Sequence, residues 1–174
     1  MINENFVYAR IGMALISAQR VEYIANQLVD ILREFDVDIF GITGQEFLTT
    51  SKKANLARAT LGTVFNLLKL NHKLIIKEEL DDYVGKRNIL AHNFWKNHLH
   101  TKSVEQAQSA VDFCQDFGIH SQKLESFFKG FVFFLALRYV KDRTQIDNEL
   151  KKWEGDFDYF MERLQEKRLQ ESAG

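Results

Sequence analysis

The absence of proline is the feature of this sequence that most limits its fold. None of the 174 residues is proline, although proline is common in turns and at edge strands and is excluded from the interior of long helices. Apolar residues make up 45 % of the chain and 15 residues are phenylalanine, which is enough for a sizeable core. The sequence therefore predicts an all-α protein, and its length fits a single domain over 1–174.

Apolar residues recur at helical spacing in five to six segments, which predicts an up-and-down bundle with mostly antiparallel neighbours. The predicted helices cover residues 5–34, 50–70, 75–95, 103–117, 121–141 and 143–171, the last of them charged and amphipathic. An irregular connection is expected over 35–50, and Gly118 predicts a break between two helices. Ser103 and Gln106 have the spacing of a capping box. Along the first predicted helix the residues that recur at helical spacing are apolar except for Arg20: Phe6, Ala9, Met13, Ile16, Arg20, Ile24, Leu28, Ile31 and Leu32.

Charge and cysteine content limit the compartment and the partners. The net charge is −1, so the chain is no polycation that coats nucleic acid, and any anion site must be local. The single cysteine, Cys114, excludes an internal disulfide and suits a reducing compartment, and its position beside Phe117 predicts core packing. The most apolar run, residues 127–140, is interrupted by Lys129 and Arg138. We therefore expect no membrane helix, no secretion signal and a cytoplasmic protein.

The predicted helix over 75–95 carries a cation on its apolar row. At 100° per residue that row consists of Leu80, Val84, Arg87, Ala91 and Phe94. Asn88 and His92 share the adjacent face, where an Asn–His hydrogen bond can orient the imidazole. Arg87 and His92 point about 140° apart on an ideal α-helix. An arginine on this row makes physical sense if the row meets a symmetric partner and an anion rather than a sealed core.

The same helix lies in a window without negative charge, because no acidic residue occurs between Asp82 and Glu105. The basic island, as we call it, consists of the positively charged and histidine residues of this window: Lys86, Arg87, His92, Lys96, His98, His100 and Lys102. Such a concentration suits phosphate, although charge runs also occur on solvated faces. No carboxylate or cysteine lies within the island to complete a metal site with its histidines, so we expect no metal and no other cofactor.

The hexapeptide "RNILAH", residues 87–92, gives this window a family resemblance. On a helix, in an all-α chain of this length, it resembles the signature of HEPN domains, which is Arg, a polar residue that is often Asn, three further residues and His. The order of the predicted helices agrees over most of the chain, with a long first helix, a second after an irregular connection and then the motif-bearing helix. The chain is thus identified as HEPN-like. This identification is a hypothesis that rests on the motif and on its position in a predicted helix.

HEPN proteins are typically small helical homodimers, many of them metal-independent ribonucleases that act as toxins or in defence against phage. The resemblance implies that Arg87 and His92 form the catalytic pair and that Asn88 is the polar second position. It implies that the motifs of both protomers meet in one cleft, that RNA is the substrate and, for toxin members, that an antitoxin is a partner. Some toxin members carry a tyrosine two residues after the histidine as the target of a modifying enzyme, whereas this chain has Phe94.

Residue chemistry is consistent with this expectation. RNA supplies its own nucleophile, the 2′-hydroxyl, which a histidine of near-neutral pKa can deprotonate, and arginine can stabilise the charge that develops on the phosphate. The expected products carry a 2′,3′-cyclic phosphate and a 5′-hydroxyl. Lys86, Lys96 and Trp95 are the predicted RNA-binding residues. The alternative is a non-catalytic HEPN-like module that binds a partner or a nucleotide, since helical bundles host many functions.

Overall fold

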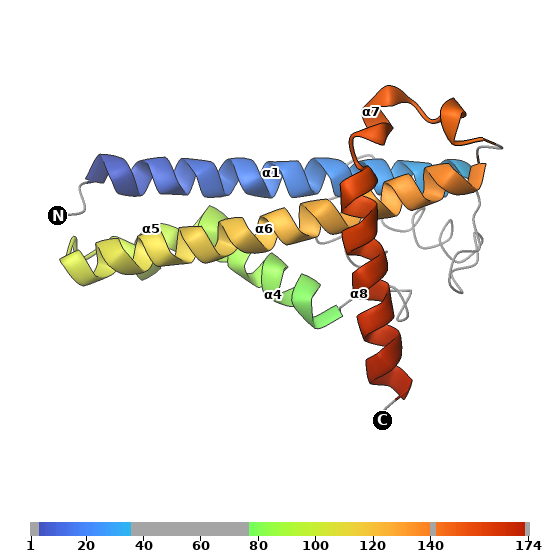
Figure 1. Cartoon of the computed structure of the whole chain (residues 1–174). Coiled ribbons are helices and arrows are strands. Elements are labelled where there is room, and N and C mark those ends of the chain that lie inside the picture. The colour runs from blue at the N-terminus through green and yellow to red at the C-terminus, as the bar shows by residue number, and fades with distance from the viewer. Residues whose placement is uncertain (1–3, 36–76, 140–141, 173–174) are drawn as a thin grey trace. The chain divides into compact units, whose positions relative to one another are not determined.

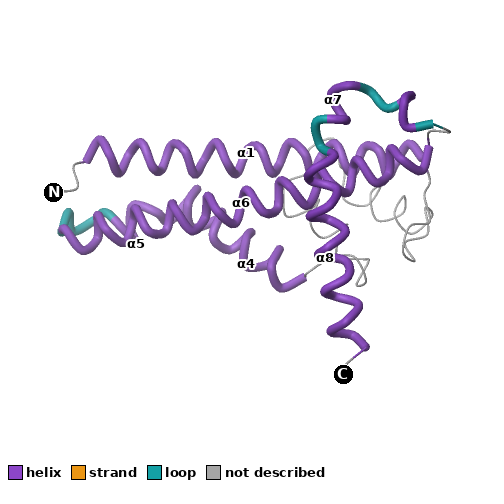
Figure 2. The backbone as a smooth tube through the Cα atoms, in the orientation of Figure 1, coloured by secondary structure: helices purple, strands orange, loops and turns teal. Residues whose placement is uncertain are grey.

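The structure, a computed structural model, describes residues 4–35, 77–139 and 142–172. Figure 1 labels its α-helices, which are α1 (Glu4–Phe35), α4 (Lys77–Asn88), α5 (Phe94–His98), α6 (Val104–Tyr139), α7 (Asn148–Lys151) and α8 (Glu154–Ser172). Two short helical turns complete the described elements: η2 (Ile89–Asn93) and η3 (Arg143–Gln145). Figure 2 shows only helices and short loops in these ranges, so the prediction of an all-α chain is confirmed. The predicted connection after Phe35 and the predicted helix over 50–70 lie outside the described residues.

The chain divides into two compact units. The first unit comprises Met1–Glu22 and Lys77–Lys123, and the second comprises Tyr23–Ile76 and Leu124–Gly174. Both α1 and α6 contribute residues to each unit, and the single domain over 1–174 stays a prediction. No helix in the described ranges is long and apolar enough to cross a membrane.

In the first unit, α4 and α5 run antiparallel to the first half of α6. The Tyr83 ring of α4 stacks on Phe117 with ring centroids 4.9 Å apart, whereas Phe94 of α5, later in the chain, meets Phe113, earlier in α6, at 5.6 Å. Aromatic pairs of this kind contribute beyond the area that they bury. The α4–α5 part of the unit is thus anchored on α6, and this contact fixes where residues 87–92 lie.

The inner face of α1 differs from the predicted one. The apolar side chains that α1 buries in the first unit are Val7, Ala14, Ala18 and Val21. In the row predicted from spacing, Met13 is 61 % and Ile16 56 % accessible, whereas Ile24 and Leu28 of the same row, in the second unit, are buried. The predicted row is therefore wrong for the first half of α1 and confirmed at Ile24 and Leu28. Two apolar rows wind along this helix, and the small side chains of the buried row permit the closer approach to neighbouring helices.

The second unit is built on the phenylalanines of α6, as expected for a core helix. Phe131 stacks on Phe160 of α8 with ring centroids 5.2 Å apart. The two helices come so close that a Cβ atom at Gly130 would overlap the Asp156 carbonyl and lie 2.6 Å from the Phe160 Cβ. A glycine at this crossing is therefore a packing requirement, because no side chain fits between the two backbones.

Helix α6 contradicts the predicted break at Gly118, because it continues without interruption from Val104 to Tyr139. A glycine inside a helix costs about 1 kcal/mol relative to alanine. Burial of Phe117 and Ser121 on either side of it holds that stretch helical despite this cost. Tertiary packing therefore overrides the local preference of the glycine.

The single helix predicted over 143–171 was also wrong. Here the helix is broken where continuity was predicted, because the stretch forms η3, α7 and α8. One aspartate, Asp142, precedes this stretch, and another, Asp147, lies within it. The Asp142 carboxylate accepts the Thr144 N–H at 2.9 Å, and the Asp147 carboxylate accepts the Glu149 N–H at 2.7 Å. Short acidic side chains that bond to the backbone in this way begin new helices rather than continue old ones.

Candidate functional site

Residues 87–92 span the junction between α4 and a single π-helical turn. Arg87 and Asn88 are the last residues of α4, and His92 lies within η2. In an α-helix, residues five apart point about 140° apart, but the hydrogen bonds of a π-turn join residues five apart. Arg87 lies just before this turn and His92 lies within it. Because a π-turn contains more residues per turn than an α-helix, the angle between Arg87 and His92 is smaller than the 140° of an ideal α-helix.

The same turn changes two expectations about neighbouring residues. Asn88 and His92 are both exposed, and no hydrogen bond joins them among the described residues, so the Asn–His hydrogen bond that helical spacing allows is not formed. On the predicted apolar row, Ala91 is exposed, and Leu90 is buried in its place. The extra residue in the π-turn shifts the buried face by about one position.

Arg87 lies at the margin of the core of the first unit. It shares a helical row with the buried Tyr83 and Leu90, and its side chain keeps 32 % of its exposure. Its Nη2 atom lies 3.9 Å from a carboxylate oxygen of Glu22 on α1. A long, half-exposed ion pair is weak and leaves most of the five guanidinium donors available. Arg87 is therefore positioned so that an anion can approach it.

The predicted RNA-binding residues have different environments. The Lys86 ammonium lies 2.7 Å from the Asp82 carboxylate, one helical turn earlier. Lys96 is exposed, and Trp95 is 67 % accessible. Carboxylates from outside the basic island, Asp82 and Glu22, thus partly neutralise its positive charge. The contribution of Glu22 could not be predicted from the charges of residues 83–104, because Glu22 is distant along the chain.

The other two histidines of the basic island have structural partners. The His98 ring packs on Phe113 with centroids 5.1 Å apart, its Nδ1 lies 3.1 Å from the Ser109 hydroxyl, and burial lowers its pKa. The His100 Nδ1 lies 3.1 Å from the amide nitrogen of Gln106. Within the described ranges, no three His, Cys, Asp or Glu residues gather as a candidate metal site.

His120 on α6 does not stand out in the sequence, because it lies outside the motif and the basic island. Its Nδ1 lies 3.8 Å from the Asp82 carboxylate, and its ring meets Tyr83 edge-on at 5.1 Å. The Nε2 atom is buried and has no hydrogen-bond partner. Burial and, to a smaller extent, the nearby Lys86 lower the pKa of His120. The imidazole is thus held in its neutral form beside the island.

Cys114 is buried in α6, as expected for core packing. Burial raises the pKa of its thiol to about 11. A thiol is a weak nucleophile, because the thiolate is the reactive form. This rules against a catalytic role for Cys114.

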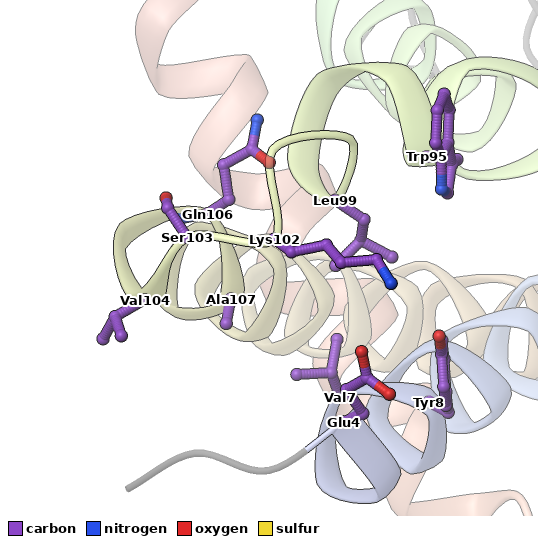
Figure 3. A pocket seen from close by; sticks show the side chains of 10 residues that line it. All are labelled: Glu4, Val7, Tyr8, Trp95, Leu99, Lys102, Ser103, Val104, Gln106 and Ala107. Carbon is purple, nitrogen blue, oxygen red and sulfur yellow. The ribbon is translucent and has the colours of Figure 1, made fainter.

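A pocket of about 140 Å³ lies at the other end of α5 (Figure 3). Residues of three elements line it, among them Glu4 and Tyr8 of α1, Trp95 and Leu99 from α5 and the turn after it, and Lys102, which precedes α6. All of them belong to the first unit. Trp95 therefore connects the pocket to the π-turn that carries His92.

The chain has no significant match among known protein families, curated proteins or solved structures. The resemblance to HEPN domains thus stays a prediction that rests on the "RNILAH" motif and its helical setting.

Proposed function

We propose that the chain is a metal-independent endoribonuclease of HEPN type, whose catalytic residues are Arg87 and His92. The observation that carries the proposal is the π-turn over Ile89–Asn93, which directly follows Arg87 and Asn88 and contains the exposed His92. π-turns are rare and occur frequently at functional sites. In this helical segment a guanidinium group can bind the phosphate of a phosphodiester, and an imidazole can transfer a proton in its cleavage.

In this mechanism His92 accepts the proton of the RNA 2′-hydroxyl, whose oxygen then attacks the adjacent phosphorus. Arg87 binds the non-bridging oxygens and stabilises the additional negative charge of the pentacoordinate transition state. The 5′-oxygen leaves with a proton from a protonated imidazole, which leaves a 2′,3′-cyclic phosphate and a 5′-hydroxyl. Asn88, exposed next to Arg87, contacts the phosphate rather than His92. No metal ion is required because the substrate supplies the nucleophile.

A homodimer completes the site in this proposal. One His92 serves as base and the second, from the partner protomer, serves as acid, which explains how one motif provides both proton transfers. The exposed side chains of Met13 and Ile16 on α1 are the kind of apolar surface that homodimer interfaces bury. RNA is the substrate, and Lys86, Lys96 and Trp95 contact it along the strand.

The biological role that we propose is that of a toxin or a component of defence against phage, restrained by an antitoxin protein. Phe94, the residue at the position where some toxin members carry a modifiable tyrosine, has no hydroxyl and is only 6 % exposed. Its ring packs on Phe113 and His98. The proposed restraint is therefore a bound protein rather than covalent modification at this position.

The second candidate function is a non-catalytic module that binds a partner or a nucleotide through Arg87, Asn88 and His92. The ion pair between Arg87 and Glu22 favours it, because the pair gives the arginine a structural role without any substrate. Substituting Glu22 separates the two. If the protein is a nuclease, Glu22→Gln keeps or raises the cleavage rate and lowers the free energy of unfolding by less than about 1 kcal/mol. If the pair is structural, Glu22→Gln lowers the free energy of unfolding by more than this, and the wild-type protein cleaves no RNA.

The test is incubation of the purified protein with single-stranded RNA, with and without EDTA. We expect cleavage that is insensitive to EDTA, products with 2′,3′-cyclic phosphate ends by mass spectrometry, and no cleavage of the corresponding DNA. Arg87→Ala and His92→Ala should each lower the rate by at least about 100-fold, in line with the loss of one acid–base or transition-state contact.

The matched controls are Arg163→Ala and Lys152→Ala, which remove exposed or half-exposed cations of the second unit and should leave the rate unchanged. Cleavage that persists in both motif variants, or that disappears with EDTA, contradicts the proposed function.

A further inference from the structure

Two exposed aromatic side chains stand on opposite walls of the pocket at the end of α5. Tyr8 of α1 is 58 % accessible and Trp95 of α5 is 67 % accessible, although both rings line a concave surface. Figure 3 shows the Lys102 side chain reaching toward the space between the two rings, with the Glu4 carboxylate beside Tyr8. The pocket thus combines two flat apolar walls with one cationic donor and one anionic acceptor at its rim.

Contacts behind the pocket support its Trp95 wall. The Trp95 ring rests edge-on against the His100 ring at 6.3 Å, and Gln106 lies 3.1 Å from His100 through its amide nitrogen. The amide oxygen of Gln106 accepts the Thr101 N–H at 2.8 Å, and the Gln106 N–H donates to the Ser103 hydroxyl at 3.1 Å. This network joins the turn before α6 to the indole. A pocket whose walls are fixed in advance loses little entropy when a ligand enters.

The size and the polar groups of the pocket indicate its ligand. Its volume of about 140 Å³ is close to that of the roughly 150 Å³ cavity that accepts a benzene ring in another protein, so it holds one six-membered ring, and the second ring of a purine would extend beyond it. Aromatic walls stack on the faces of nucleobases. The Glu4 carboxylate can accept from an exocyclic amino group, as acidic side chains do with the cytosine N4 amine, and Lys102 can donate to a ring carbonyl.

We propose that this pocket is a base-binding subsite for a pyrimidine of the RNA substrate, with cytosine favoured over uracil. The inference rests on the proposed function, because that function supplies the RNA strand. Trp95 follows His92 by three residues, so their Cα atoms are at most about 11 Å apart. A base held against Trp95 therefore belongs to the scissile nucleotide or to its neighbour. The pocket selects which phosphate is placed between Arg87 and His92.

The test uses the fluorescence of Trp95, which stacking of a base on the indole quenches. The chain has two tryptophans, so Trp153→Phe leaves Trp95 as the only reporter, and His92→Ala in the same protein prevents cleavage during titration. Short oligocytidylate, oligouridylate and oligoadenylate are titrated in turn. We expect oligocytidylate to quench Trp95 with the highest affinity and oligoadenylate with the lowest.

Substitutions in the pocket then assign the binding. Tyr8→Ala should weaken oligocytidylate binding by about tenfold, the effect of losing one stacked base. Glu4→Gln should reduce the preference for cytosine over uracil but leave quenching in place. The control is Tyr23→Ala, which removes another exposed tyrosine of α1 (65 % accessible) outside the pocket and should change nothing.

The result separates this inference from the proposed function. Equal affinity for the three oligonucleotides, or binding that Tyr8→Ala does not weaken, overturns the subsite even if the wild-type protein cleaves RNA. Selective quenching that depends on Tyr8 and Glu4 supports the subsite even if cleavage fails, in which case only the nuclease proposal falls.

Discussion

Single residues in this protein take their chemistry from neighbours that are distant in the sequence. Arg87 lies on a row of α4 whose neighbouring apolar side chains are buried. Its guanidinium group is nevertheless partly exposed, and it meets Glu22 of α1. Long cationic side chains commonly bury their stems in this way. His120 is the opposite case, with a polar atom that is buried and has no hydrogen-bond partner. Arg87 can therefore bind an anion, whereas burial favours the neutral form of the His120 imidazole.

The lowered pKa of His120 predicts that the protein loses stability in mild acid. Burial is the main cause, Lys86 and Lys123 act in the same direction, and Glu79 and Asp82 oppose them. In the unfolded chain this histidine takes up a proton near its ordinary pKa of 6.5, whereas the folded protein takes it up only at lower pH. The unfolded state therefore binds more protons in that window, and the free energy of unfolding falls as the pH decreases below about 6.5.

Urea denaturation at a series of pH values measures this effect. In His120→Gln the loss of stability below pH 6.5 should be smaller than in the wild type. His98, whose pKa burial also lowers, accounts for part of the remaining slope. The same pH dependence in His120→Gln and the wild type contradicts the assignment to His120.

At the scale of elements, the π-turn η2 and the long helix α6 decide where functional side chains lie. The π-turn changes the angle between residues on either side of it, and α6 supplies the surface on which Tyr83 and Phe94 anchor the segments on either side of the turn. In the second unit, the crossing of α6 and α8 depends on Gly130. Two glycines of α6, Gly118 and Gly130, therefore have opposite roles in one helix.

Gly130→Ala and Gly118→Ala form a matched pair that tests this difference. The new methyl group at Gly130 overlaps the Asp156 carbonyl, so we expect a loss of about 2 kcal/mol in the free energy of unfolding. At Gly118 no atom lies within 4 Å of the added carbon, and alanine should stabilise the helix by about 0.5–1 kcal/mol. Chemical denaturation measures both. A neutral Gly130→Ala variant contradicts the close crossing.

At the scale of the whole molecule, the proposed chemistry needs two chains. One motif supplies one imidazole, whereas the reaction transfers two protons, and His120 is too buried to supply the second. The basic island is also modest, since Asp82 and Glu22 offset Lys86 and Arg87. An isologous interface brings two islands together and doubles the local charge. Association therefore supports both the catalysis and the binding of RNA in the proposed enzyme.

Light scattering tests the dimer. We expect the wild-type protein to have twice the mass of one 20.3 kDa chain at micromolar concentration. Ile16→Asp places a charge on the exposed apolar row of α1 and should shift the mass toward the monomer and abolish cleavage. Gln122→Asp introduces the same charge at an exposed polar position and should do neither. A wild-type monomer contradicts the composite site.

The sequence by itself determined the fold class, because helical periodicity without proline leaves few alternatives, and it marked Arg87, Asn88 and His92 through their spacing. It also predicted that Cys114 and the phenylalanines of α6 are core residues. Tertiary structure decided which of two apolar rows α1 buries, that α6 continues through Gly118, and that Glu22 meets Arg87. These outcomes depend on contacts between residues distant along the chain, whereas periodicity reports only what repeats along one helix. The π-turn is likewise not predicted by periodicity, since one extra residue in the turn changes which side chains face each other.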